Sequence, residues 1–161
     1  MSDFFMSFEV QSIIKLLLGF TLAGIIGAER ESLNKPAGFK THSLIGISSV
    51  LVMLCGEYLS MTGNADASRI PAQLLSGIGF IGAGTILRDG LTVKGLTTAA
   101  SLLAVTCIGL SIGAGFYLGG IIATILSYII LSRSHKAINV NLSDESEEVE
   151  KIDIAQTKQE E

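Results

Sequence analysis

The longest apolar run of the chain extends from Gly95 to Ser132 and contains 38 consecutive residues without aspartate, glutamate, lysine, arginine or histidine. A single helix of that length would measure about 57 Å at 1.5 Å per residue, whereas the hydrocarbon core of a bilayer is roughly 30 Å thick. The run therefore predicts two membrane-spanning helices joined by a tight turn, and Gly113-Ala114-Gly115 supplies the turn residues.

Three further apolar segments lie upstream of this run, separated by short polar and charged stretches. We therefore predict an all-α integral membrane protein, and its membrane domain occupies residues 1–136. The domain is expected to be a bundle of five transmembrane helices, with spans near residues 10–28, 43–61, 70–87, 95–112 and 116–132.

Lysine and arginine are distributed unevenly between the loops on alternate sides of these spans. Seven of them follow the first, third and fifth spans, whereas the opposite side carries Arg69 and also Lys15, if that side chain reaches outward from the first span. The positive-inside rule then places the N-terminus outside and the C-terminus in the cytoplasm.

The acidic residues are concentrated at the C-terminal end. The whole chain has a net charge of −4 at pH 7, but 8 of its 15 acidic residues lie in the last 18 positions. Residues 137–161 are expected to form an acidic, disordered cytoplasmic tail, because the segment is polar and lacks aromatic side chains. The negative net charge therefore describes the tail, and neither an acidic binding surface nor a nucleic-acid partner is expected.

The segment SGIGFIGAG, residues 76–84, contains the spacing G-x-G-x-x-G that is typical of dinucleotide-binding loops. Such a loop follows a hydrophobic strand and precedes an acidic residue by about 20 positions. Here Pro71 suits the first turn of a helix, and the region about 20 positions downstream carries no charge. A phosphate-binding loop is therefore rejected.

Two interpretations stay open for the glycines of this segment, which are Gly77, Gly79, Gly82 and Gly84. Small residues let neighbouring transmembrane helices approach closely, and the first span has the same feature in the pattern Gly19-x-x-x-Ala23-x-x-x-Gly27. Alternatively, the glycines break the third span, and its freed carbonyl groups line a polar cavity. Helix packing is the favoured interpretation.

Polar residues gather at both predicted membrane faces, where ionisable groups are expensive and are either interfacial anchors or functional groups. The candidates on the inner face are Glu29, Arg30, Glu31, Lys40, Thr41, His42 and Lys94. The candidates on the outer face are Asp66, Arg69 and Gln73.

Each candidate has a structural interpretation as well as a functional one. Glu29, Arg30 and Glu31 either fix the depth of the first helix or form a cation or proton site, although two glutamates do not make an octahedral Mg²⁺ site. His42 is expected to be a structural hydrogen-bond donor rather than a metal ligand. On the outer face, Asp66 is expected to cap the following helix, and Arg69 is a candidate partner of Glu57.

The sequence contains no nucleophile–base pair, no metal-ligand spacing and no P-loop. We therefore expect a protein that is not an enzyme and that has no cofactor.

Four blocks of the sequence resemble the MgtC/SapB family of bacterial inner-membrane proteins. They are GAERE, KPAGFKTHSLIGI, DASRIPAQLLSGIGFIGAGTIL and VKGLTTAASL, and the similarity extends over roughly residues 15–130. The resemblance implies a five-span protein of the bacterial inner membrane, linked to magnesium homeostasis and, in pathogenic relatives, to survival inside host cells. Longer relatives carry a C-terminal cytoplasmic domain, whereas this chain continues only as its acidic tail.

Two functions follow from the residues and the resemblance together. The first is a regulator of a larger membrane complex that acts through helix–helix contacts, and the family resemblance implies the F-type ATP synthase as a partner. The second is a small cation transporter or channel for Mg²⁺ or H⁺, which would require a homo-oligomer because five short spans are few for a pore.

Overall fold

The structure is a computed structural model that describes residues 2–63, 66–90 and 92–132, with side chains from position 7 onward. The predicted acidic tail, residues 137–161, lies outside the described residues. The chain divides into two compact units, Met1–Tyr128 and Ile129–Glu161, and the sites described below belong to the first unit.

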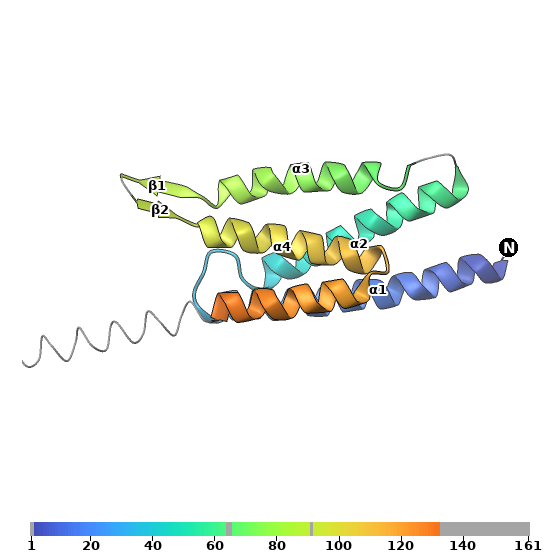
Figure 1. Ribbon diagram of the computed structural model, residues 1–161, viewed down its shortest axis with the longest axis horizontal. Coiled ribbons are helices and arrows are strands. Elements are labelled where there is room, and N and C mark those ends of the chain that lie inside the picture. Colours follow the sequence, from blue (N-terminus) through green and yellow to red (C-terminus); the bar gives the residue numbers. More distant parts are fainter. Residues whose placement is uncertain (1, 64–65, 91, 133–161) are drawn as a thin grey trace, which may run out of the picture. The chain divides into compact units, whose positions relative to one another are not determined.

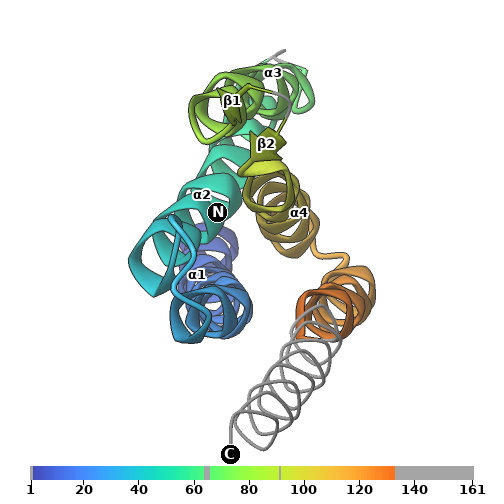
Figure 2. The same cartoon turned by 90° about the vertical axis from the view of Figure 1, so that its left-hand side faces the viewer.

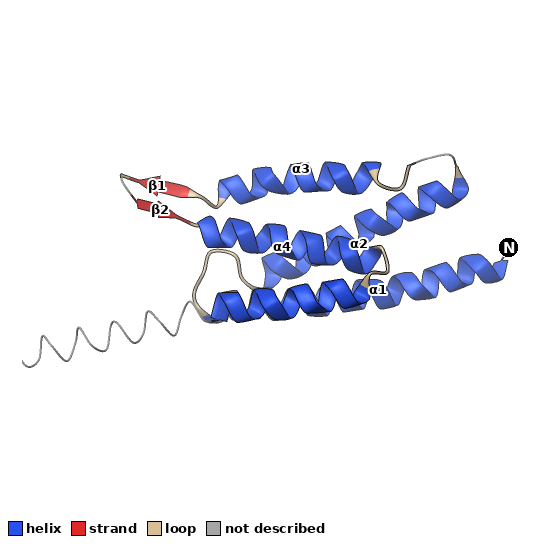
Figure 3. Cartoon of the chain, in the orientation of Figure 1, coloured by secondary structure: helices blue, strands red, loops and turns tan. Residues whose placement is uncertain are grey.

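Each of the five predicted spans corresponds to a helix in the described part of the chain (Figures 1 and 3). Three of these helices are long and apolar enough to cross a membrane, namely Ser7–Ser32 within α1, α2 and α4. The bounds are α1 Ser2–Ser32, α2 Phe39–Thr62, α3 Arg69–Gly84, β1 Leu87–Asp89, β2 Thr92–Lys94, α4 Leu96–Gly113 and a final helix Tyr117–Ser132.

A two-stranded antiparallel hairpin between α3 and α4 departs from the purely helical prediction. The third span was predicted to reach residue 87, but α3 ends at Gly84 and β1 pairs with β2, with Asp89 opposite Thr92. Gly90 has a φ of +59°, a value that glycine adopts without steric cost. The Asp89-Gly90 dipeptide, a common hairpin signal, was the sequence feature that indicated this turn.

Helices α1 and α2 pack along the small-residue pattern that the sequence places in the first span. A Cβ atom at Gly19 would meet Val50, one at Gly46 would meet Ala23, and one at Gly27 would lie 2.9 Å from His42 Cβ. Each four-residue step forward along α1 thus corresponds to a four-residue step back along α2, as expected for antiparallel neighbours. The predicted packing role of this pattern is confirmed.

Helix α4 packs against the same two helices and completes their shared core. A Cβ atom at Gly109 would lie 2.8 Å from the Gly46 carbonyl oxygen, and one at Gly113 would lie 2.6 Å from Met53 Cβ. Figure 2, which views the helices from one end, shows α2 and α4 between α1 and α3. The fully buried apolar side chains come from α1, α2 and α4, and the largest are Ile26, Val50, Leu102, Val105, Ile108 and Ile112.

Helix α3 contacts the bundle through one narrow strip. Only Pro71, Ile78 and Gly82 are buried on this helix, and they lie on one side of it because their spacing follows the helical period. The rest of its circumference faces away from the described part of the chain.

Candidate functional site

Lys15 is buried between α1, α2 and α4, and it forms the first polar cluster of the bundle. Its Nζ donates a hydrogen bond of 2.8 Å to the Gly113 carbonyl at the end of α4, and lies 3.4 Å from Glu57 Oε2 on α2. The positive charge meets the C-terminal end of α4, where the helix dipole favours a cation. We call Lys15, Glu57 and the Gly113 carbonyl the lysine site.

The lysine site corrects one expectation from the sequence, because Glu57 pairs with Lys15 rather than with Arg69. Lys15 is only 5% exposed, and its Nζ extends to the end of α4 that the predicted topology places on the outer side. A charge within an apolar helix requires a partner that faces the bundle interior. The position of Lys15 inside the run IIKLLLGF was the signal for such a pair, but the sequence does not show which acidic residue lies level with it.

His42 and Arg30 form a second polar cluster, where α1 ends and α2 and α4 begin. His42 is fully buried, and its Nδ1 lies 3.0 Å from the Gly38 carbonyl and its Nε2 3.0 Å from Ser101 Oγ. A carbonyl only accepts, so Nδ1 donates to Gly38, while Ser101 Oγ also donates a hydrogen bond of 2.8 Å to the Thr98 carbonyl. His42 thus joins α2 to α4 through these contacts.

Arg30 lies near His42 and near the carboxylate of Glu29, yet it forms no ion pair in the described part of the chain. The residue is 3% exposed, and its Nε is buried without a hydrogen-bond partner there. The hydroxyl of Ser43 on α2 is also buried without a partner among the described residues. We call Arg30 and His42 the arginine site.

Glu31 has a local structural role at the start of α2. One of its carboxylate oxygens, Oε2, accepts a hydrogen bond of 2.7 Å from the Phe39 backbone N–H. This N–H belongs to the first turn of α2 and has no partner within the helix, so the carboxylate satisfies an N–H group that would otherwise be free. Glu31 therefore holds the α1–α2 turn together across eight residues.

The remaining inner-face candidates do not converge on a single site. Glu29 and Thr41 are half-buried, whereas Lys40 and Lys94 are exposed. The structure shows no hydrogen bond or ion pair for their side chains within the described residues.

Asp66 precedes α3 in a local turn rather than capping the helix directly. Its Oδ1 accepts hydrogen bonds from the Ser68 backbone N–H at 2.9 Å and from Ser68 Oγ at 2.8 Å. These bonds favour the ionised carboxylate and lower the pKa of Asp66 below its ordinary value. The turn is therefore retained as the pH falls, until the pH reaches that lowered pKa.

Gln73 and the glycines of α3 lie on the exposed part of that helix. Gln73 makes no side-chain hydrogen bond within the described residues, and a Cβ atom at Gly77, Gly79 or Gly84 would meet nothing within 4 Å. Gly82 alone of these four glycines faces the bundle, since a Cβ atom there would lie 3.5 Å from Ala99 Cβ. The helix is continuous from Arg69 to Gly84, so the alternative of a glycine-broken span is not what the structure shows.

The carboxylates do not gather around a metal position. Among the described residues, no group of three or more histidine, cysteine, aspartate or glutamate side chains is placed to hold a metal ion. Magnesium prefers octahedral coordination by oxygen atoms, and Glu31 already accepts a hydrogen bond from α2. The described side chains therefore do not fit a resident Mg²⁺ ion.

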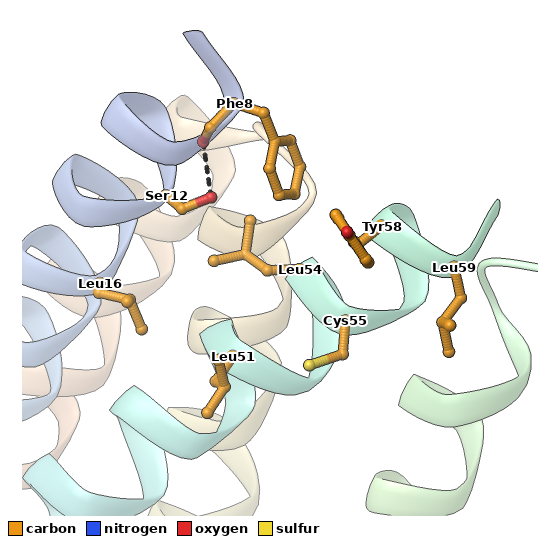
Figure 4. A pocket seen from close by; sticks show the side chains of 8 residues that line it. All are labelled: Phe8, Ser12, Leu16, Leu51, Leu54, Cys55, Tyr58 and Leu59. Carbon is orange, nitrogen blue, oxygen red and sulfur yellow. Dashed lines mark hydrogen bonds between the residues drawn. The ribbon is translucent and has the colours of Figure 1, made fainter. Parts of the chain in front are cut away.

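A groove between α1 and α2 lies near the lysine site but has a different character (Figure 4). Its volume is about 350 Å³, and Ser12 Oγ is already bonded to the Phe8 carbonyl at 2.7 Å. The lining is mostly aliphatic and aromatic, so it offers few oxygen ligands to a cation. The lining residues are Phe8, Ser12, Leu16, Leu51, Leu54, Cys55, Tyr58 and Leu59.

The chain is a helical integral membrane protein. Its apolar helices are long enough to span a membrane, they pack against one another through glycine residues, and a charged pair lies between them. The profile of the MgtC family matches residues 16–139 of the chain. The chain belongs to the MgtC family.

Three relatives illustrate this membership. "Putative magnesium transporter YhiD" of Escherichia coli strain K12 is 42% identical over 130 residues, which cover 77% of this chain and 60% of that protein. "Protein MgtC" of Salmonella typhimurium strain LT2 is 39% identical over 131 residues, which cover 79% of this chain and 55% of that protein. An uncharacterized protein of Synechocystis is 37% identical over 118 residues, with coverages of 72% and 49%.

The chain thus spans about half to three fifths of the length of these curated relatives. No solved structure matches it.

Proposed function

We propose that this chain is a non-enzymatic membrane protein that regulates a larger membrane complex through helix–helix contacts. The observation that carries the proposal is the α3 outer face, which we define as Gln73, Ser76, Gly77, Phe80, Ala83 and Gly84. All six residues are exposed, and Phe80 is 86% exposed. Their spacing places them on the side of α3 opposite to its buried strip.

The composition of this face supports contact with another transmembrane helix. Small residues allow two helix backbones to approach, and an amide in an apolar environment gains by bonding across the interface. In α1, α2 and α4 the glycines are covered by neighbouring helices, whereas Gly77 and Gly84 have no neighbour within 4 Å. The α3 outer face thus has the composition of the covered faces but lacks a partner in the described part of the chain.

The setting that we propose is the bacterial inner membrane, with five spans, an external N-terminus and a cytoplasmic C-terminus. The name of the Escherichia coli relative supports a link to magnesium, and we place the function in adaptation to low magnesium. The family resemblance further supports the F-type ATP synthase as a partner, with a second copy of the chain as the other candidate.

Photo-crosslinking from position 80 tests the regulatory proposal. A photoreactive residue in place of Phe80 is expected to capture a membrane protein in living cells, and Gly77→Leu is expected to abolish that product by blocking close approach. The matched control places the same residue at Leu103 of α4, which is 47% exposed. Equal capture from both positions, or capture unaffected by Gly77→Leu, would contradict the proposal.

Cation transport is the second candidate, and the lysine site favours it. A charged pair enclosed by three apolar helices is a common mark of an ion or proton pathway. Purified protein in liposomes that contain a magnesium-sensitive dye would then admit Mg²⁺ at a saturable rate, and Glu57→Gln would reduce the rate. If inserted protein admits no more Mg²⁺ than empty liposomes, transport of this ion is excluded.

A further inference from the structure

The Nε atom of Arg30 is buried in the bundle without a hydrogen-bond partner in the described residues. The residue is 3% exposed and its Nε has no partner there, while the ion pair seen in the described part of the chain joins Lys15 to Glu57. An arginine keeps its charge at any physiological pH. A buried charge without a counter-ion is unfavourable, so an anionic acceptor would stabilise Arg30.

The nearby carboxylates do not fill this role. Glu31 Oε2 accepts a hydrogen bond from the Phe39 backbone N–H, and neither Glu29 nor Glu31 lies within ion-pair distance of Arg30, although the charge of Glu29 acts on it. Neither α2 nor α4 has an acidic residue in its first turn. The acceptor is therefore not a glutamate or aspartate of the described chain.

The electrostatic surroundings of Arg30 favour an anion from outside the chain. Arg30 lies where α2 and α4 both begin, since His42 in the second turn of α2 bonds Ser101 in the second turn of α4. Helix N-termini carry a partial positive charge, which stabilises anions.

We propose that Arg30 binds an oxyanion of the phosphate class, with the N-terminal ends of α2 and α4 contributing to its stabilisation. The planar guanidinium presents paired N–H donors that match two oxygens of a phosphate group. A lipid headgroup phosphate and free inorganic phosphate offer the same group. The site is independent of the regulatory and transport proposals, because it uses neither the α3 outer face nor the lysine site.

Thermal unfolding of the full-length protein distinguishes the two sources of the anion. Delipidated protein in neutral detergent is titrated with inorganic phosphate against chloride at the same ionic strength. In parallel, the protein is placed in nanodiscs of phosphatidylcholine alone or with added phosphatidylglycerol. We expect the unfolding temperature to rise by several degrees with phosphate, with phosphatidylglycerol or with both. A rise with phosphatidylglycerol alone identifies the lipid headgroup.

Variants determine whether Arg30 is responsible. Arg30→Gln is expected to abolish the rise, and Lys40→Gln, which removes an exposed charge nearby, is expected to retain it. Arg30→Lys keeps the charge but loses the paired donors, so it is expected to fold and to weaken binding about tenfold. The proposal is wrong if wild-type protein responds to neither anion, or if Lys40→Gln reduces the response as much as the Arg30 variants do.

Discussion

Gly46 lies where α2 faces both α1 and α4. A Cβ atom at this position would collide with Ala23 Cβ and lie 3.1 Å from the Gly19 carbonyl oxygen. On the other side, the Gly46 carbonyl is in contact with Gly109. Gly77, by contrast, has open space around it although it also lies within a helix. The two glycines therefore have different physical roles despite their similar local sequence.

We expect Gly46→Ala to lower the free energy of unfolding by about 1 to 3 kcal/mol, because the added methyl group overpacks the helix interface. Gly77→Ala is the matched control. It is expected to leave stability unchanged or raise it slightly, since alanine is the better helix former by roughly 0.5 to 1 kcal/mol. Unfolding curves in detergent measure both variants. Equal destabilisation would mean that α3 also packs through Gly77 in the isolated protein.

At the scale of the helices, polar contacts hold together both ends of the bundle formed by α1, α2 and α4. The lysine site joins all three helices near the middle of α1, at the level where α4 ends. The contact between His42 and Ser101 joins α2 to α4 near the end of α1. Lys15 and Arg30 are 15 residues apart, so the two sites are separated by about 23 Å along the helix.

A double-mutant cycle tests the lysine site. Glu57→Gln is expected to cost about 1 to 3 kcal/mol, because it leaves the buried Lys15 ammonium without its counter-ion, while solvent near the partly exposed Glu57 reduces the effect. Lys15→Met is expected to cost less, since it removes the buried charge itself. The double variant should lose less unfolding free energy than the sum of the losses in the two single variants. Strict additivity would show that the two side chains do not interact.

At the scale of the whole molecule, the distribution of positive charge predicts how the chain lies in the membrane. The turn between α1 and α2 carries Lys35, and the hairpin before α4 carries Arg88 and Lys94. The segment between α2 and α3 follows the opposite end of α2 and ends at Arg69. The positive-inside rule places the first two segments in the cytoplasm and the third outside.

Cysteine labelling in intact cells tests this orientation. In a background with Cys55→Ser and Cys107→Ala, Gly63→Cys is expected to react with a membrane-impermeant thiol reagent. Lys35→Cys is expected to react only after the cells are made permeable. The reverse pattern would place the N-terminus in the cytoplasm, and reaction of both positions in intact cells would rule out a span formed by α2.

The sequence by itself determined the class of protein, the position of each helix and the glycine pattern that joins α1 to α2. These features follow from composition and from periodicity within short segments, which depend on residues close together in the chain. Even the hairpin has a local signal in Asp89-Gly90.

Only the tertiary structure decided which side of each helix faces its neighbours, and which residues of neighbouring helices lie opposite one another. Lys15 pairs with Glu57 because the short α1–α2 turn and the contacts of Gly19, Gly46 and Gly27 set the register of the two helices. Both α1 and α3 are rich in glycine. The rotation of α3 about its own axis, however, directs only Gly82 of its Gly77, Gly79, Gly82 and Gly84 toward the bundle. Register and rotation arise from packing between distant segments, and local sequence does not specify them.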